Sequence, residues 1–252
     1  MSVQMALHRT PSGEGESTRS RWERHASPQQ LYPLAGRLMG WAWAISALLA
    51  AAGLSVGLLI APAEGQQGDA DRIILVHLPA AGLSLLIYLS MAFWCALALV
   101  LNSRMASMMA SALAPTGLLM TFIALWTGAL WDKPTWGTWW VWDARLISEL
   151  LLILLYIGFM ALQSAIDDRR RMQRASTLLV LGGGLAVPAT HFSDPWWSAP
   201  LHGASWSVTG MLLMTAAVWA WSFAAALHRV RSIILESERH ADWVRQQLEL
   251  RR

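Results

Sequence analysis

Three histidines and a dense group of tryptophans are the residues of this sequence best suited to chemistry. His77, His191 and His202 lie in or beside short polar stretches between long apolar runs, whereas the other four histidines lie nearer the two ends of the chain. Four tryptophans fall within seven residues: Trp136, Trp139, Trp140 and Trp142. Imidazole nitrogens are common metal ligands, and indole rings provide wide, flat apolar surfaces. Together these side chains predict a site for a large planar ligand that carries a metal ion.

His77 and His202 are the pair that we expect to hold the metal. His77 precedes Pro79 at the start of one apolar run and His202 lies just before another, so both should lie at a similar depth, on either side of the tryptophans. Two imidazoles that face each other across a flat site can supply both axial ligands of a haem iron. Because the chain has one cysteine, a zinc site would need two or three histidines with Asp143 or Asp194. We favour haem, since zinc would leave the tryptophans without a role.

The tryptophans would form a shelf if their segment is helical. In a helix, four side chains would lie on one face: Trp136, Trp139, Trp140 and Asp143. Such a face would bind a planar ring through stacking and through burial of apolar area. An elaborate membrane anchor is the alternative, because indole rings also settle at the level of lipid headgroups.

Arg145 is the charged residue near the tryptophans that we expect to contact the ligand. Haem carries two carboxylates, and the guanidinium fork matches carboxylate geometry. The alternatives are internal pairing of Arg145 with Asp143, or extension of its side chain to the membrane surface. Arg72 is a second candidate for the same contact, and Asp143 is expected to hold the loop geometry or an indole N–H.

The elements that must position these residues are membrane helices. The chain has 252 residues, of which 55% are hydrophobic and 14% charged, with a mean hydropathy of +0.39. Soluble domains carry about 25% charged residues, so this composition excludes a water-soluble globular fold, a disordered chain and a coiled coil. Six intervals lack Asp, Glu, Lys and Arg and are long enough to cross about 30 Å of hydrocarbon as helices. Their cores are expected near residues 39–60, 82–101, 107–130, 147–166, 175–190 and 206–227.

The predicted fold is therefore an all-α integral membrane protein with six transmembrane helices and cytoplasmic N- and C-termini. All of the 19 Lys and Arg residues except Arg72, Lys133 and Arg145 fall on the side of the termini, and basic residues mark the cytoplasmic side. The net charge of +3 then indicates a rim near anionic membrane lipid and not a nucleic-acid surface.

Three regions follow from this topology. Residues 1–37 are expected to form a disordered cytoplasmic tail. Residues 38–228 form the membrane domain, with a short amphipathic Trp-rich segment on the outer face at 131–146. Residues 229–252 form a second cytoplasmic tail, which can fold as an amphipathic helix.

Three segments also carry the motifs of a known family. The main one is the stretch WGTWWVWDARLISELLLILLYIG, preceded by TFIALWTGALWDKP. The others are DRIILVHLPAAGLSLLIYLSMAF around His77 and HFSDPWWSAPLHGAS around His202. From about Leu38 to His228, the chain resembles the cytochrome c maturation protein C family (haem exporter protein C) of the WWD-domain haem-handling superfamily.

The resemblance implies a protein that presents haem b at the periplasmic face of the bacterial inner membrane and is not an enzyme. In the family, two outer-loop histidines ligate the haem iron, and they correspond to His77 and His202. The Trp-rich loop holds the macrocycle, at positions that correspond to Trp136, Gly137, Trp139, Trp140, Trp142 and Asp143. The implied partners are the ABC transporter subunits A and B, a small membrane subunit of the same maturation system, and the periplasmic haem chaperone, maturation protein E.

The chain departs from the family pattern at two places. Ile147 stands where the family usually has Thr, and the segment between Trp197 and His202 is one residue longer than in the family and includes Pro200.

Three rival functions stay open. A WWD-type cytochrome c haem lyase or synthase usually has more spanning helices, and an electron-carrying cytochrome would place histidines inside its helices. A transporter of another planar ligand would not need the two histidines. No catalytic residue is expected, because the sequence shows no paired carboxylates, triad or nucleophile elbow.

Overall fold

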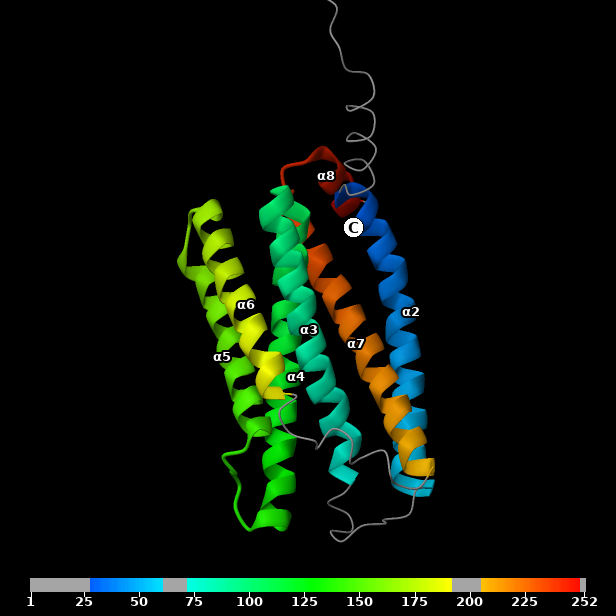
Figure 1. The fold of residues 1–252 in the computed structure, drawn as a ribbon. Helices are drawn as coiled ribbons and strands as arrows, with labels where there is room; N and C mark the ends of the chain where they lie inside the picture. The colour runs from blue at the N-terminus through cyan, green and yellow to red at the C-terminus, as the bar shows by residue number, and fades with distance from the viewer. Residues whose placement is uncertain (1–27, 61–71, 192–204, 250–252) are drawn as a thin grey trace, which may run out of the picture.

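The computed structural model describes residues 28–60, 72–191 and 205–249, and it gives side chains in these ranges except at 185–191, 205–207 and 246–249. All regular elements in these ranges are helices (Figure 1). They are α2 (Pro28–Ser55), its continuation as the π-helix η1 (Val56–Ile60), α3 (Ile74–Leu101), α4 (Arg104–Trp136), α5 (Ala144–Ala165), α6 (Arg169–His191), α7 (Ser205–Ser237) and the short α8 (Asp242–Glu249).

The prediction of a helical membrane protein is confirmed by five of these helices. By length and composition, α2 with η1, α3, α4, α5 and residues 208–237 of α7 can each cross a membrane. The sixth predicted span, residues 175–190, falls within α6, which packs against α5 and α3. Membrane crossing by α6 stays a prediction.

Short capped connections make neighbouring helices antiparallel. Asn102 ends α3 with a left-handed backbone (φ 48°). Ser103 follows at once, and its hydroxyl accepts a hydrogen bond from the backbone N–H of Ala106, 3.3 Å away, at the start of α4. A side-chain oxygen at this position satisfies one of the free N–H groups of a first helical turn. The chain therefore reverses direction within two residues, and α3 packs along α4.

Several helices extend beyond the charge-free intervals that predicted them. α2 begins at Pro28, inside the predicted tail, and α7 continues to Ser237, beyond the predicted domain boundary at 228. Apolar packing outside the charge-free intervals explains the extensions. Tyr32, Met108, Val230 and Ile234 are buried together, and Trp243 of α8 packs edge-on against Tyr32 with ring centroids 5.9 Å apart.

The main core lies between α3, α4, α5 and α6, where two tyrosines meet. The rings of Tyr88 and Tyr156 are perpendicular, with centroids 5.6 Å apart. The hydroxyl of Tyr156 donates to the carbonyl of Ser84 at 2.8 Å, and that of Tyr88 donates to the carbonyl of Val180 at 2.9 Å. A Cβ atom on Gly117 of α4 would overlap the ring of Tyr156, so a residue without a side chain is required there.

α2 packs mainly against α7. The hydroxyl of Ser46 donates to the carbonyl of Ala217 at 2.9 Å. Where α2 leads into η1, the two backbones touch, because a Cβ atom on Gly210 would lie only 3.0 Å from the Cα atom of Gly57. Glycines at such crossings let membrane helices approach closely.

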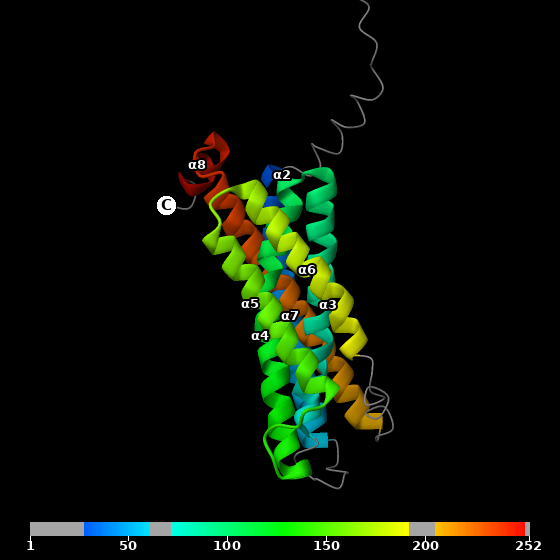
Figure 2. The same ribbon diagram turned by 60° about the vertical axis from the view of Figure 1, so that its left-hand side comes forward.

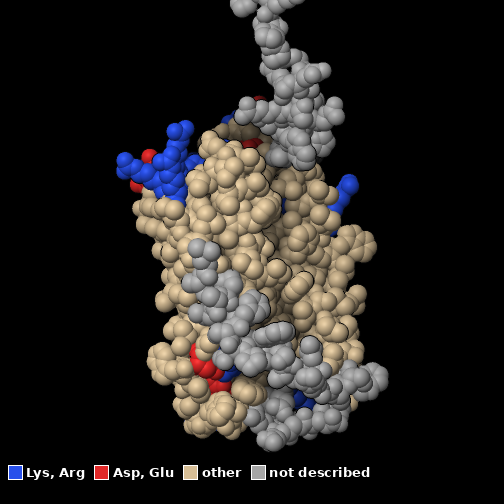
Figure 3. All heavy atoms as spheres, viewed as in Figure 1, with Lys and Arg blue, Asp and Glu red and all other residues tan. Residues whose placement is uncertain are grey.

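Charged side chains gather at the two ends of the helical bundle. Figures 1 and 2 place the α4–α5 connection at the end opposite α8. On the face drawn in Figure 3, Lys, Arg, Asp and Glu lie near these ends, and the described surface between them carries other residue types. This banding is what a hydrocarbon layer requires of a spanning protein.

Candidate functional site

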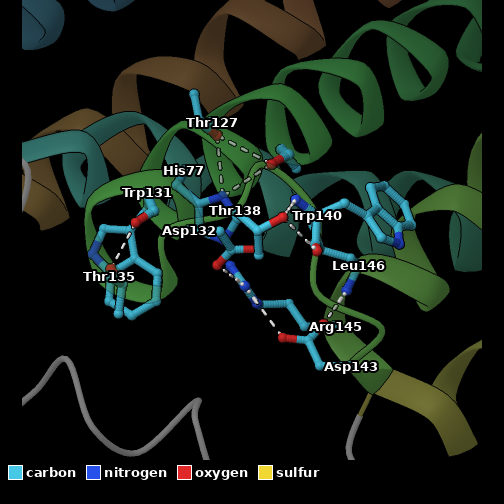
Figure 4. Close-up of polar contacts among 11 residues, drawn as sticks. His77, Thr127, Trp131, Asp132, Thr135, Thr138, Trp140, Asp143, Arg145 and Leu146 are labelled. Carbon is cyan, nitrogen blue, oxygen red and sulfur yellow. Dashed lines mark hydrogen bonds and ion pairs between the residues drawn. The ribbon is translucent and has the colours of Figure 1, made fainter.

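His77 lies on the first turn of α3, at the end of the bundle that carries the α4–α5 connection, and its ring is oriented by α4. Its Nδ1 atom lies 3.0 Å from the carbonyl oxygen of Ala124 and 3.0 Å from the hydroxyl of Thr127 (Figure 4). A carbonyl oxygen can only accept a hydrogen bond, so Nδ1 carries the hydrogen. In the neutral ring the lone pair is then on Nε2. A backbone carbonyl that fixes the tautomer in this way is typical of metal-binding histidines.

Gly128 brings His77 next to Arg145. A Cβ atom on Gly128 would lie 3.3 Å from Cε1 of His77 and 3.3 Å from Nη1 of Arg145. The imidazole of α3 and the guanidinium of α5 therefore meet over a glycine of α4. Gly128 was not among the predicted site residues, and its sequence position within an apolar helix gives no signal of this role.

Arg145 is held by two carboxylates. Its Nη2 atom lies 2.6 Å from Oδ1 of Asp132 and 3.2 Å from Oδ2 of Asp143 (Figure 4). Its guanidinium carbon also lies 5.6 Å from the centre of the Trp131 ring. The internal pairing of Arg145 with Asp143 that the sequence left open is thus present. Asp132 is an addition, because sequence reasoning did not include it in the site.

The prediction of a helical shelf at residues 136–143 is wrong. α4 ends at Gly137, which has a left-handed backbone (φ 75°) and donates its N–H to the carbonyl of Lys133 at 3.0 Å. At the other side, the extended Asp143 starts α5 by accepting the N–H of Leu146 at 2.8 Å. Glycine ends helices in this conformation and aspartate starts them, so the two residues enforce a loop between them.

The loop divides the tryptophans into exposed and partly buried ones. Trp136, Trp139 and Trp142 are 63%, 55% and 78% exposed. Trp140 is half-buried, with its ring 5.4 Å from that of Trp142 at 74°. Lys133 covers the Trp139 ring at 5.6 Å and donates to the carbonyl of Gly137. Exposed indole rings are therefore present, but Trp139 and Trp142 lie on the loop instead of a helix face.

A buried carboxyl group lies one helical turn beyond Arg145. Glu149 of α5 is 2% exposed. Its Oε2 atom lies 3.4 Å from the hydroxyl of Ser84, and that hydroxyl also donates to the carbonyl of Ala81 at 2.7 Å. Glu149 therefore places a third carboxyl group behind the site, after Asp132 and Asp143.

His202, the second predicted iron ligand, lies outside the described residues, as does most of the motif around it. His191 is the last residue of α6, and Arg72 is half-buried just before α3. The structure thus brings together His77, Arg145 and Asp143 with the Trp-rich loop, and the pairing of His77 with His202 stays a prediction.

Asp143 allows a direct test of how the loop is held. We expect Asp143→Ala to lower the free energy of unfolding by about 1 kcal/mol through loss of the helix cap, and further through loss of an Arg145 partner. Asp143→Asn keeps a capping oxygen and should be less destabilised. Thermal unfolding in detergent measures both, and equal melting temperatures for the two variants would contradict a capping role.

Known proteins resemble this chain over most of its length. A family model described as Heme exporter protein C matches residues 21–245. The Heme exporter protein C of Escherichia coli is 42% identical over 234 residues, which cover 87% of this chain and 93% of that protein. Those of Haemophilus influenzae and Bradyrhizobium diazoefficiens are 43% and 42% identical and cover 72% and 70% of this chain, and 74% and 66% of their own lengths.

Proposed function

The chain belongs to the heme exporter protein C family, and from this premise we propose that it binds haem and delivers it to a periplasmic haem chaperone during c-type cytochrome biogenesis. Haem b is the cargo, and the protein is a carrier and not an enzyme. The observation that carries the proposal is the orientation of His77. Its Nδ1 hydrogen faces the carbonyl of Ala124, which leaves the lone pair on Nε2, the atom that would bind iron.

The site residues then have distinct roles. His77 and His202 are the axial ligands of the haem iron. The macrocycle lies against the Trp-rich loop, with the indole surfaces of Trp136, Trp139, Trp140 and Trp142 excluding water from it. Gly137 and Asp143 fix the two ends of that loop. Arg145 offers its remaining N–H groups to a haem carboxylate.

The proposed topology places this site on the periplasmic side of the bacterial inner membrane. α6 is the sixth spanning helix, and both termini are cytoplasmic. The support comes from the basic residues: Arg104 starts α4, and Arg169, Arg170, Arg171 and Arg174 lie at the start of α6, away from the α4–α5 connection. The basic end lies beside anionic lipid headgroups.

A carrier of this kind works within an assembly. The proposed partners are the ABC transporter subunits A and B, the small membrane subunit of the maturation system, and the chaperone, maturation protein E. Haem bound against an open loop leaves one edge accessible to the chaperone. Three strongly exposed tryptophans support this arrangement, because their rings are not covered by the described part of the chain.

Visible spectroscopy tests the proposal. We expect the purified protein to bind haem with a low-spin spectrum, and His77→Ala and His202→Ala each to lose that spectrum. Haem transfer to the chaperone should fall about tenfold or more. The exposed His228 of α7 provides the control, as His228→Ala should behave like the wild type. If the spectrum survives loss of both His77 and His202, a transporter of another planar ligand is favoured instead.

A further inference from the structure

Two carboxylates share one nitrogen atom of Arg145. Asp132 lies 2.6 Å and Asp143 3.2 Å from Nη2. An Nη atom of arginine carries two hydrogens, so these two contacts occupy both of them. The N–H groups of Nη1 and Nε take no part in these contacts and can serve a further acceptor.

The guanidinium of Arg145 faces two carboxyl groups, those of Asp132 and Asp143. Asp132 is 0% exposed, and its second oxygen, Oδ2, has no hydrogen-bond partner in the part of the chain that the structure describes. Asp132 therefore depends on Arg145 for its charge compensation, since an unpaired buried charge is costly. Asp143 adds a second carboxyl group, so two acidic side chains face one guanidinium.

This cluster lies beside the proposed iron ligand. Nη1 of Arg145 and Cε1 of His77 are both 3.3 Å from the position of a Cβ atom on Gly128. Any ligand bound to His77 therefore lies close to the guanidinium and to the carboxylates that hold it.

We propose that Asp132 weakens the hold of Arg145 on the carboxylates of haem and so tunes haem release. The inference rests on the proposed function. A haem carboxylate that approaches Nη1 or Nε would be the third negative group around one positive charge. Asp132 is a positioning residue in this scheme, because it acts through Arg145 and does not contact haem. Removing its charge leaves Arg145 balanced by Asp143 alone and strengthens the contact with haem.

Haem release separates this role from a structural one. Wild-type protein and Asp132→Asn are loaded with haem or with haem dimethyl ester, whose carboxylates are blocked, and release is followed after addition of excess apomyoglobin. We expect Asp132→Asn to release haem about tenfold more slowly than the wild type, because changes at buried charge pairs act mainly on dissociation rates. Release of the ester should be the same in both proteins. Equal rates for haem, or equal slowing of haem and ester, would overturn the proposal.

Two further measurements keep the result interpretable. Asp168→Asn removes the same charge at the start of α6, where Asp168 accepts the N–H of Arg171, and should leave both rates unchanged. The wild type alone should release haem and its ester at rates within about threefold of each other, because Arg145 is already neutralised; a much slower release of haem would contradict the proposal without any variant. If the wild type binds neither compound, the proposed function itself fails.

Discussion

In a His77→Gly variant, we expect haem affinity to fall on the order of a hundredfold and to return when imidazole is added. The substitution removes the ring and leaves the groups that oriented it. The carbonyl of Ala124 and the hydroxyl of Thr127, each 3.0 Å from Nδ1 in the wild type, can hold a free imidazole in the same tautomer. Titration of the Soret band with and without millimolar imidazole measures the effect.

Rescue distinguishes a ligand from a packing residue. His240→Gly changes an exposed histidine at the far end of the bundle, and it should neither lose haem nor respond to imidazole. If His77→Gly binds haem as tightly as the wild type, or stays folded but does not respond to imidazole, His77 does not hold the iron.

Gly117→Ala should destabilise the protein by about 1–3 kcal/mol, the usual cost of overpacking a core. The added methyl group would overlap the ring of Tyr156. That ring cannot move freely, because it packs on Tyr88 and its hydroxyl is bonded to the carbonyl of Ser84. Thermal unfolding in detergent, together with the yield of monodisperse protein, measures the loss.

A matched substitution, Gly82→Ala, should not destabilise the protein as Gly117→Ala does. A Cβ atom on Gly82 of α3 would meet nothing within 4 Å, so Gly82→Ala should be neutral or stabilise the helix by up to about 1 kcal/mol. Adding Tyr156→Leu to Gly117→Ala should recover part of the stability, because the two sites are in contact. Equal effects of Gly117→Ala and Gly82→Ala would contradict the steric argument.

The helices were predictable because hydrocarbon imposes a simple rule on sequence. In a chain of this hydropathy, a run without charged residues such as 105–131 indicates a spanning helix directly. The helix ends were not predictable from that rule. Tyr32 and Ile234 lie in helical turns beyond the charge-free runs because they pack against each other's helices, and this packing depends on contacts between distant segments.

Site residues whose chemical type indicates a role were predictable from the sequence. Residues that matter only through their position in the fold were not. Histidine and clustered tryptophan indicate a ligand by type, whereas Gly128 matters only because two side chains converge on it. The expected helical shelf does not form, because residues that end and start helices override the helical spacing of the tryptophans. Gly137 and Asp143 are residues that end and start helices, and both are visible in the sequence. Asp132 was missed because its partner, Arg145, lies across the loop.

The packing of α2 on α7 has a consequence for biosynthesis. The first of these helices is made well before the second, with α3, α4, α5 and α6 between them in the chain. α2 therefore has to wait in the bilayer, without its main neighbour, until translation of α7 is complete. The close approach of Gly57 and Gly210 can form only then, so the bundle acquires its final shape only after α7 has left the ribosome.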